Sequence, residues 1–410
     1  LGPSAERRQG REAGLKLEAP RLEVRYVDNA QSLRALIEDL DAVDVIGLDA
    51  ERASGFRYSH RAYLIQIAIK GVAIYLVDPE GFEDDQWAQE LAAAMAKTTW
   101  ILHAATQDLP CLAELGIKPT SLIDTELAAR LAGLERFGLA SLAETLLDME
   151  LAKEHSAADW SQRPLPESML SYAALDVDVL FELWGALEHA LTEQGKLEWA
   201  MEEFQHLVGF KAKEQAAEPW RQLPGMSKIK DERKQKIAAS LWLARNKVAM
   251  EKDVAPGRLI PDRSIAAVVA DPPKSKSQLA ANKQFQGRAS RTMLDLWWRS
   301  ISEAESVELG EEVRSSDFIP NHRSWEKRFP EAHARLAATR PLIVDKATEL
   351  AMPVENLLTP DILRRVCFEP AENLEAQLAL LGARKWQVEL CAPLIGAGLD
   401  LAITPPTAEV

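Results

Sequence analysis

The hydrophobic pattern of the first half of the chain alternates between short apolar runs and amphipathic stretches. Five apolar runs are typical of buried strands, and they span residues 43–48, 62–69, 72–77, 100–103 and 122–123. A turn at Lys70-Gly71 joins the second and third runs, and a helical pattern follows the fifth at 125–132. A strand meander followed by strand–helix alternation predicts a mixed sheet flanked by helices.

The pattern becomes helical after residue 210. In residues 229–250 an apolar stripe recurs at helical spacing, at Ile237, Leu241, Ala244 and Val248. Prolines divide the following segment into short helices. We therefore expect an α/β domain followed by all-α domains, with a polar tail at 1–20, the α/β domain at 21–208, a helical domain at 211–305, a linker at 306–330 and a second helical domain at 331–402.

Charge is distributed unevenly along the chain. The 410 residues include 48 Lys and Arg and 63 Asp and Glu, and the net charge of −15 taken alone argues against a nucleic-acid partner. Residues 21–210 carry a net charge of −19 and residues 301–410 one of −7, whereas residues 211–300 hold 19 basic and 9 acidic residues. The basic segment therefore indicates a separate module that can contact an anionic partner.

Composition also bears on the cellular compartment of the protein. No apolar run approaches the roughly 20 residues that a membrane helix requires. Three cysteines are too few and too scattered for a disulfide framework or a zinc site, and the polar first 20 residues do not have the pattern of a signal peptide. We expect a cytoplasmic protein with no membrane partner and no obligate protein partner, hence a monomer.

Acidic residues occur at three places where an α/β fold can bring them together. Asp49 and Glu51 are alternate residues at the end of the first predicted strand, so their carboxylates share a face. Asp108 opens the helix after the fourth strand, near the strand ends where ligands collect. Tyr172 and Asp176 lie four apart on a predicted helix. Each motif also has a structural alternative: Glu51 in a solvated loop, Asp108 as a helix-start acid, and a chance Tyr–Asp pair.

Two neighbouring ionisable residues are expected to be structural. His103 ends the fourth predicted strand and has no metal-ligand spacing to its neighbours, so we expect a hydrogen-bonded strand-end residue. Asp178 falls on a different helix face from Asp176, and we expect it to be solvated.

The order of the three motifs resembles the DEDD superfamily of 3′→5′ exonucleases, in its tyrosine-bearing subclass, and within it the ribonuclease D family. The family motifs D-x-E, H-x-A-x-x-D and Y-x-x-x-D match Asp49 and Glu51, then His103, Ala105 and Asp108, then Tyr172 and Asp176. Lys153 and the segments 122–125 and 159–165 also resemble the family's connecting pattern. Ala50 stands where threonine is usual and Met169 where glutamine is frequent, which puts substrate contacts rather than catalysis in doubt.

The resemblance implies an RNase H-like fold and two-metal hydrolysis of a phosphodiester. Its metal ligands are Asp49, Glu51, Asp108 and Asp176, which hold two Mg²⁺ or Mn²⁺ ions, with Asp49 shared between them. Tyr172, the fifth catalytic residue, orients the attacking water, because a phenol with a pKa near 10 is a poor base at neutral pH.

The basic segment resembles the HRDC domain, and residues 331–402 resemble a second domain of that kind. Basic residues interleaved with an aromatic ring suit single-stranded nucleic acid. The candidate contacts are Lys274, Lys276, Lys283, Phe285, Arg288 and Arg291. The alternative is a solvated lysine face with Phe285 in the core.

These observations predict a 3′→5′ exoribonuclease that shortens RNA from a free 3′ end one nucleotide at a time, and the resemblance makes tRNA precursors or other structured RNAs the natural substrates. The first alternative is a 3′→5′ DNA exonuclease of repair type. The second is a non-catalytic nucleic-acid scaffold, which predicts the loss of at least one carboxylate, and none is lost. The chain has no GxxxxGK[ST] phosphate loop, which excludes a helicase.

Overall fold

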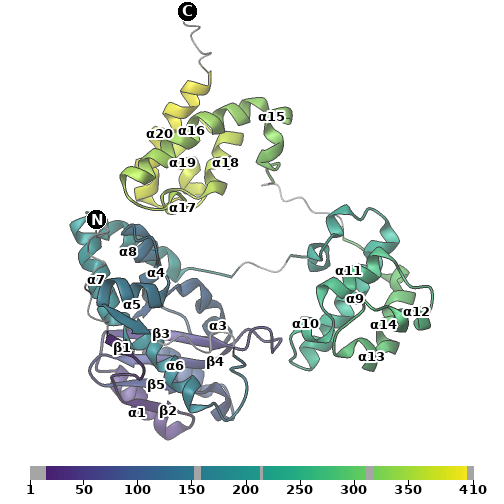
Figure 1. The fold of residues 1–410 in the computed structure, drawn as a ribbon. Helices are drawn as coiled ribbons and strands as arrows, with labels where there is room; N and C mark the ends of the chain where they lie inside the picture. The colour runs from purple at the N-terminus through teal and green to yellow at the C-terminus, as the bar shows by residue number, and fades with distance from the viewer. Residues whose placement is uncertain (1–14, 152–157, 213–215, 311–317, 404–410) are drawn as a thin grey trace, which may run out of the picture.

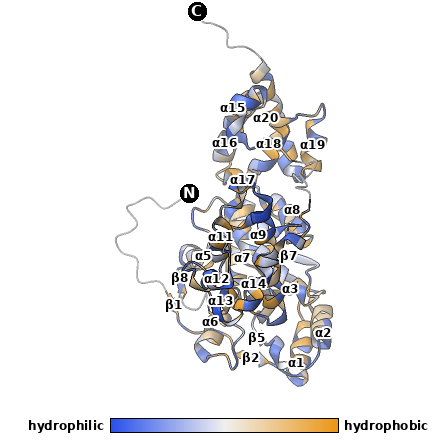
Figure 2. Ribbon diagram, turned by 90° about the vertical axis from the view of Figure 1, so that its right-hand side faces the viewer, coloured by the Kyte–Doolittle hydropathy of each residue, from blue (hydrophilic) through white to orange (hydrophobic). Residues whose placement is uncertain are grey.

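The computed structural model describes residues 15–151, 158–212, 216–310 and 318–403, and Lys153 therefore lies outside the described residues. A domain built on a β-sheet comes first, and two helical domains follow it (Figure 1). The prediction of an α/β domain followed by all-α domains is confirmed. In Figure 2 the helices carry both hydrophobic and hydrophilic bands, as expected of helices that cover a core on one face.

The sheet has six strands in the order β2-β5-β4-β3-β6-β7. Two pairs, β3–β4 and β4–β5, are antiparallel, and the other three are parallel, so the predicted mixed sheet with a central meander is confirmed. β4 is buried at every position, which explains its uninterrupted apolar run. The strands are β2 (Val24–Val27), β3 (Val45–Arg52), β4 (Ala62–Ile69), β5 (Ala73–Val77), β6 (Thr99–Leu102) and β7 (Ser121–Asp124).

β3 is longer than the sequence pattern predicts. The apolar run ends at Leu48, but the strand continues to Arg52, with Asp49 paired opposite Gln66 and Glu51 opposite Leu64. The strand continues because β4 supplies ladder partners for polar residues, which hydropathy does not register. Glu51 is therefore held in the sheet, and the alternative of a solvated loop is wrong.

In the part of the domain that the structure describes, eight α-helices surround the sheet. They are α1 (Ala30–Leu40), α2 (Gln86–Met95), α3 (Leu109–Glu114), α4 (Thr125–Leu131), α5 (Leu139–Leu147), α6 (Glu167–Asp178), α7 (Leu180–Glu193) and α8 (Leu197–Val208). Of these, α6 packs across β3, β4 and β5. The segment before α6 is fastened by Arg163, whose guanidinium bonds Asp78 and the carbonyl oxygens of Tyr63 and Trp160. This anchoring fixes the helix that faces the acidic strand.

The expected tail and linker are partly structured. Residues 15–17 form β1 (Leu15–Leu17), which pairs in parallel with β8 (Met149–Leu151). Near the end of the expected linker, α15 (Trp325–Arg328) brings Trp325 into the core with no exposed surface. Both segments were predicted as irregular because three- and four-residue elements carry too little periodicity to detect.

The first helical domain has its own core, which includes the fully buried rings of Phe285 and Trp297. Its helices are α9 (Glu232–Glu251), α10 (Pro256–Leu259), α11 (Asp262–Ala270), α12 (Lys276–Ala281), α13 (Ala289–Thr292) and α14 (Leu294–Ser302). The second domain contains α15 and then α16 (Pro330–Glu349), α17 (Val354–Leu357), α18 (Pro360–Phe368), α19 (Leu374–Leu380) and α20 (Lys385–Ile403). None of the described helices is long and apolar enough to cross a membrane.

Both helical domains contact the sheet domain through specific polar bonds. In the first, the Asp253 carboxylate accepts hydrogen bonds from the backbone N–H groups of Tyr58 and Ser59, in the loop after β3. In the second, Arg384 forms a forked pair with the buried Glu203 of α8, at 2.6 and 2.9 Å. The loop that leaves the acidic strand is thus tied directly to the basic domain.

Candidate active site

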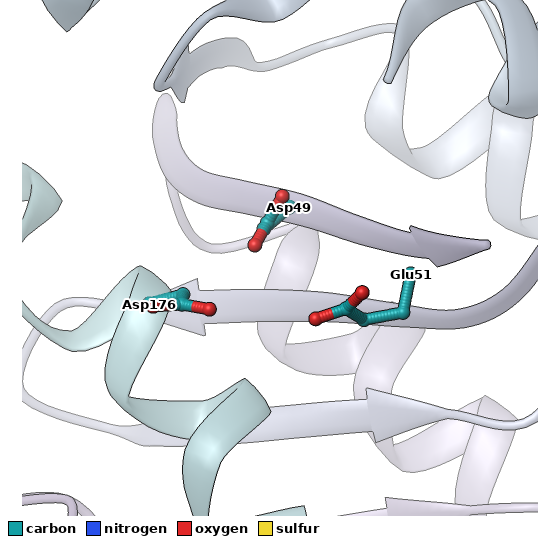
Figure 3. Close-up of side chains that lie close together, drawn as sticks. All are labelled: Asp49, Glu51 and Asp176. Carbon is teal, nitrogen blue, oxygen red and sulfur yellow. The ribbon is translucent and has the colours of Figure 1, made fainter. Parts of the chain in front are cut away.

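Three carboxylates meet where β3 faces α6. Asp49 and Glu51 project from the strand and Asp176 from the helix into a shared space (Figure 3). One ligand oxygen from each lies within 4.8 Å of the others. The close approach of helix and strand depends on Gly47, because a Cβ there would lie 3.3 Å from the backbone oxygen of Val177. The predicted meeting of the first and third motifs is thus observed.

Tyr172 lies one turn before Asp176 on α6, and its hydroxyl hydrogen-bonds the Asp176 carboxyl group. Both side chains line a cavity of about 510 Å³ together with Asp49, Glu51 and Asp108. Burial, followed by the nearby acidic groups, raises the pKa of Tyr172 well above its ordinary value. All five predicted catalytic positions therefore line one cavity, and the tyrosine keeps its proton at neutral pH.

Asp108 reaches the same cavity from the turn after β6. The turn includes the short helix at Ala105–Gln107, and Ala104 before it has a left-handed backbone with φ of 59°. Asp108 is buried, and after burial the nearby Asp49 carboxylate is the next cause that raises its pKa. Asp49 thus belongs both to this carboxyl pair and to the cluster with Glu51 and Asp176, which makes it the central acid of the site.

The acidic groups raise one another's proton affinity. Burial is the largest cause for each, and neighbouring carboxylates add to it for Glu51, Asp108 and Asp176, so that the pKa of Glu51 rises to about 9. The pKa values of Asp108 and Asp176 are raised well above the ordinary range, and that of Asp49 is raised as well. Four acids cannot all ionise together without a compensating cation. This donor set consists only of carboxylate oxygens, the ligands that Mg²⁺ and Mn²⁺ prefer, so the residues fit such ions.

Asp124 positions Asp108 and was missed as a functional residue. Its buried carboxylate accepts hydrogen bonds from the N–H groups of Ala104 and Ala105 and from those of Glu126 and Leu127 at the start of α4. One side chain therefore holds both the turn that carries Asp108 and the next helix. The sequence showed Asp124 only as part of a connecting pattern, and its location at the end of a predicted strand was the available signal.

Arg52 was also missed. It follows Glu51 on β3, lines the cavity, and opposes the rise in pKa of Glu51, Asp49 and Asp108. It is thus a positive charge beside the acidic cluster. The signal was its place in the sequence, directly after the D-x-E motif.

Of the two residues expected to be structural, the prediction for His103 is confirmed and that for Asp178 is wrong. His103 Nδ1 lies 2.9 Å from the Thr125 hydroxyl oxygen, which confirms a hydrogen-bonded strand-end residue, and burial lowers its pKa to about 4. The prediction of a solvated Asp178 is wrong, because Asp178 is buried and accepts bonds from the backbone N–H and guanidinium of Arg21. Arg21 comes from a segment far away in sequence, which no local helix pattern can reveal.

The candidate nucleic-acid residues of the basic domain divide into three groups. Phe285 is fully buried in the domain core, so its assignment as a base-stacking ring is wrong. Arg291 donates to the backbone oxygens of Phe285 and Asn282, and Lys276 pairs with Asp295. The three remaining candidates, Lys274, Lys283 and Arg288, are exposed. Phe285 was misassigned because an isolated aromatic residue among lysines carries no periodicity that would place it inside.

Comparison with protein families divides the chain in the same way. Residues 24–192 match the model of a 3′-5′ exonuclease, and residues 234–301 match that of the HRDC domain. Residues 318–399 match the model of the 3′ to 5′ exonuclease C-terminal domain. The first helical domain is thus of the HRDC kind, and the second corresponds to the C-terminal domain of such nucleases.

Several known proteins are similar over much of the chain. Ribonuclease D of Shewanella sp. (strain ANA-3) is 31% identical over 261 residues, covering 62% of this chain and 66% of that protein. Ribonuclease D of Acidiphilium cryptum is 25% identical over 377 residues, covering 89% and 90%.

Two solved structures share the arrangement of domains. A protein from Bifidobacterium adolescentis has a TM-score of 0.85 and 34% identity, covering 94% of this chain and all of that one. Escherichia coli RNase D, described as an exoribonuclease involved in structured RNA processing, has a TM-score of 0.68 at 23% identity, covering 93% and 99%, which shows a common fold.

Proposed function

Because the chain belongs to the DEDD 3′→5′ exonucleases of the ribonuclease D type with an HRDC domain, we propose that it acts on RNA, shortening it by one nucleotide at a time. One observation carries the proposal. Asp49, Glu51, Asp108, Tyr172 and Asp176 line a single cavity, and no carboxylate of the set is missing. A non-catalytic scaffold would have no need to keep four acids whose pKa values are raised by their burial together.

In this proposal Asp49, Glu51, Asp108 and Asp176 hold two divalent cations, Mg²⁺ or Mn²⁺, with Asp49 as the shared ligand. Such ions supply positive charge to the attacking and leaving oxygens of the phosphodiester. The carboxylates must release their protons to bind them, so binding competes with protonation of Glu51, whose pKa is about 9.

The uncharged and basic residues of the cavity orient the substrate. The Tyr172 hydroxyl keeps its proton because burial and nearby acids raise its pKa. Its O–H donates to Asp176, so its oxygen is the group that accepts a hydrogen bond and orients the attacking water. Arg52, at the edge of the acidic cluster, attracts the phosphate that precedes the scissile bond.

The substrate class is supported by the relatives and by the basic domain. Ribonuclease D proteins match most of the chain, and residues 211–300 supply a net charge of +10. We propose that Lys274, Lys283 and Arg288 contact the phosphates of the RNA, with tRNA precursors or other structured RNAs as natural substrates. The three cysteines are buried thiols without a disulfide, a state that fits the reducing cytoplasm. We also propose the domain limits at 21–208 and 211–305 for the first two folded units, whereas the second helical domain begins before the expected residue 331, because it includes α15.

The test compares single-stranded RNA and DNA of one sequence, labelled at the 5′ end. The variant Asp49→Asn removes the central carboxylate and keeps its shape, and the control Asp44→Asn changes an exposed acid at the start of the same strand. We expect the wild type and the control to shorten RNA stepwise with Mg²⁺ or Mn²⁺. EDTA and Asp49→Asn should each abolish the reaction.

Two results would contradict the proposal. If RNA is shortened equally well by Asp49→Asn or in EDTA, the carboxylate cluster is not the catalytic site. If DNA is degraded faster than RNA at equal salt, the DNA exonuclease alternative takes its place. The exposed basic residues are tested separately: Lys283→Ala with Arg288→Ala should lower the slope of log affinity against log salt by about one per lost phosphate contact.

A further inference from the structure

A buried amide lies beside the central acid of the site. Gln66 is on β4, directly opposite Asp49 of β3, and has no exposed surface. Among the described residues, neither its Nε2 nor its Oε1 has a hydrogen-bond partner. An amide with four hydrogen-bonding positions is thus buried without a partner opposite Asp49. Asp49 is the acid that belongs both to the pair with Asp108 and to the cluster with Glu51 and Asp176.

The side chain of Gln66 lies on the sheet face that carries the active site. Gly47, Asp49 and Glu51 are alternate residues of β3 and share one face, and a Cβ on Gly47 would contact Val177 of α6. Residues directly opposite on antiparallel strands point to the same face, with Cβ atoms about 4.5–5.5 Å apart. The Gln66 amide is therefore placed between the sheet and α6, within reach of the Asp49 carboxyl group.

A glutamine at this position is unfavourable for stability alone. The residues two before and two after it on β4, Leu64 and Ala68, are fully or almost fully buried and apolar. A buried amide without partners loses its bonds to water and gains none in return. A methionine of similar length would fill the same space without that loss. A glutamine at this position is therefore explained by a state of the site in which its amide has a hydrogen-bond partner.

The partner that fits is Asp49 itself. The Asp49 carboxylate accepts the N–H of Ala50 at 2.9 Å. The two oxygens of a carboxylate together offer about four acceptor positions, so Asp49 can accept a further donor. The one uncommitted donor directly across the strand pair, among the described residues, is Gln66 Nε2.

We propose that Gln66 is a positioning residue, whose amide N–H donates to the Asp49 carboxylate and fixes its orientation when the site binds divalent cations. The inference rests on the proposed function of the cluster as a two-metal site. Groups that hydrogen-bond a ligating carboxylate tune its orientation, and their loss typically weakens metal binding about 10- to 100-fold.

The test measures Mn²⁺ binding in the full-length protein without substrate, by electron paramagnetic resonance of free Mn²⁺. Gln66→Met and Gln66→Leu remove the amide, and Thr339→Val is the control, because it removes a buried polar group from α16 of the second helical domain. Melting temperatures are recorded in EDTA and in saturating Mn²⁺. We expect Gln66→Met to melt in EDTA no lower than the wild type, because an unpartnered amide is removed.

Mn²⁺ should bind Gln66→Met and Gln66→Leu about 10- to 100-fold more weakly than the wild type, and the gain in melting temperature on adding Mn²⁺ should shrink accordingly. Thr339→Val should bind as the wild type does. Unchanged Mn²⁺ affinity in the Gln66 variants, whatever their stability, would overturn the inference and leave the two-metal proposal intact. A wild type that binds no Mn²⁺ would instead overturn both.

Discussion

Asp124→Asn tests whether one buried carboxylate holds the turn after β6 that carries Asp108. One oxygen of Asp124 accepts the N–H groups of Ala104, Glu126 and Leu127 at 2.9–3.1 Å, and the other accepts that of Ala105 at 2.9 Å. In the asparagine variant the amide oxygen can take over the first three bonds. Its NH₂ group then faces the Ala105 N–H, so two donors oppose each other.

The expected loss follows from these contacts. One hydrogen bond to a charged acceptor, worth about 1.5–3 kcal/mol, disappears, and a buried donor is left without a partner at about 1–3 kcal/mol. Removing a buried charge offsets part of this, since burial already raises the pKa of Asp124. We expect the turn to be destabilised by about 2–4 kcal/mol, that is, a fall in protection of roughly 30- to 900-fold.

The assay is amide hydrogen exchange of peptides covering residues 103–114, read by mass spectrometry in EDTA. The control is Asp231→Asn, because the Asp231 side chain caps α9 through the exposed Lys234 N–H, a position where asparagine caps equally well. RNA cleavage should fall with the protection, since Asp108 follows the turn. Protection of 103–114 within threefold of the wild type would refute the assignment of Asp124 as the residue that holds Asp108.

Three further predictions follow from the site and its supports. Tyr172→Phe should lower the cleavage rate at saturating RNA by about 100-fold, because it removes the hydroxyl that orients the attacking water; single-turnover kinetics measure this, and a full rate would contradict it. In EDTA, the free energy of unfolding should fall as pH rises from about 5 to 9, because the folded protein keeps a proton on Glu51 that the unfolded chain releases (pKa about 9, against 4.5 when unperturbed). Thermal melts measure this, and saturating Mn²⁺ should abolish the dependence on pH. A stability that rises with pH in EDTA would refute the reasoning. Glu203→Ala should destabilise the contact of the second helical domain by about 3 kcal/mol, because Arg384 and the Trp386 indole N–H lose the carboxylate that accepts from both. Urea unfolding measures this, and Glu198→Ala, which changes an exposed acid on the same helix α8, is the control.

The sequence predicted the parts of this fold that depend on local periodicity or on ordered motifs. The buried strands β4 and β5, the long helix α9 and the motif residues that line the cavity all belong to this class. What could not be predicted depends on contacts between distant segments. Asp178 is buried by Arg21, from a segment more than 150 residues earlier. Glu51 stays in a strand because β4 pairs with it.

The same reasoning explains the errors in the basic domain. Phe285 is enclosed by a core that includes Trp220 and Trp297, and only the packing of several short helices reveals that enclosure. The sequence did not indicate the roles of Gln66 and Asp124. The role of Gln66 depends on Asp49, which lies opposite it on the paired strand, and that of Asp124 depends on the backbone of the turn that it holds. Sequence spacing identifies residues that act on substrate, whereas the residues that position them become visible only with the fold.

The chain segments that supply the carboxylates also determine when the active site can form while the protein is being translated. Asp49 and Glu51 come from β3, Asp108 from the turn after β6, and Asp176 from α6, near the end of the sheet domain. A nascent chain that has emerged only through α4 has formed most sheet strands but lacks the helix that completes the cluster. Domains of growing chains fold as they emerge, N-terminal parts first. The carboxylate cluster therefore cannot be complete before α6 has emerged.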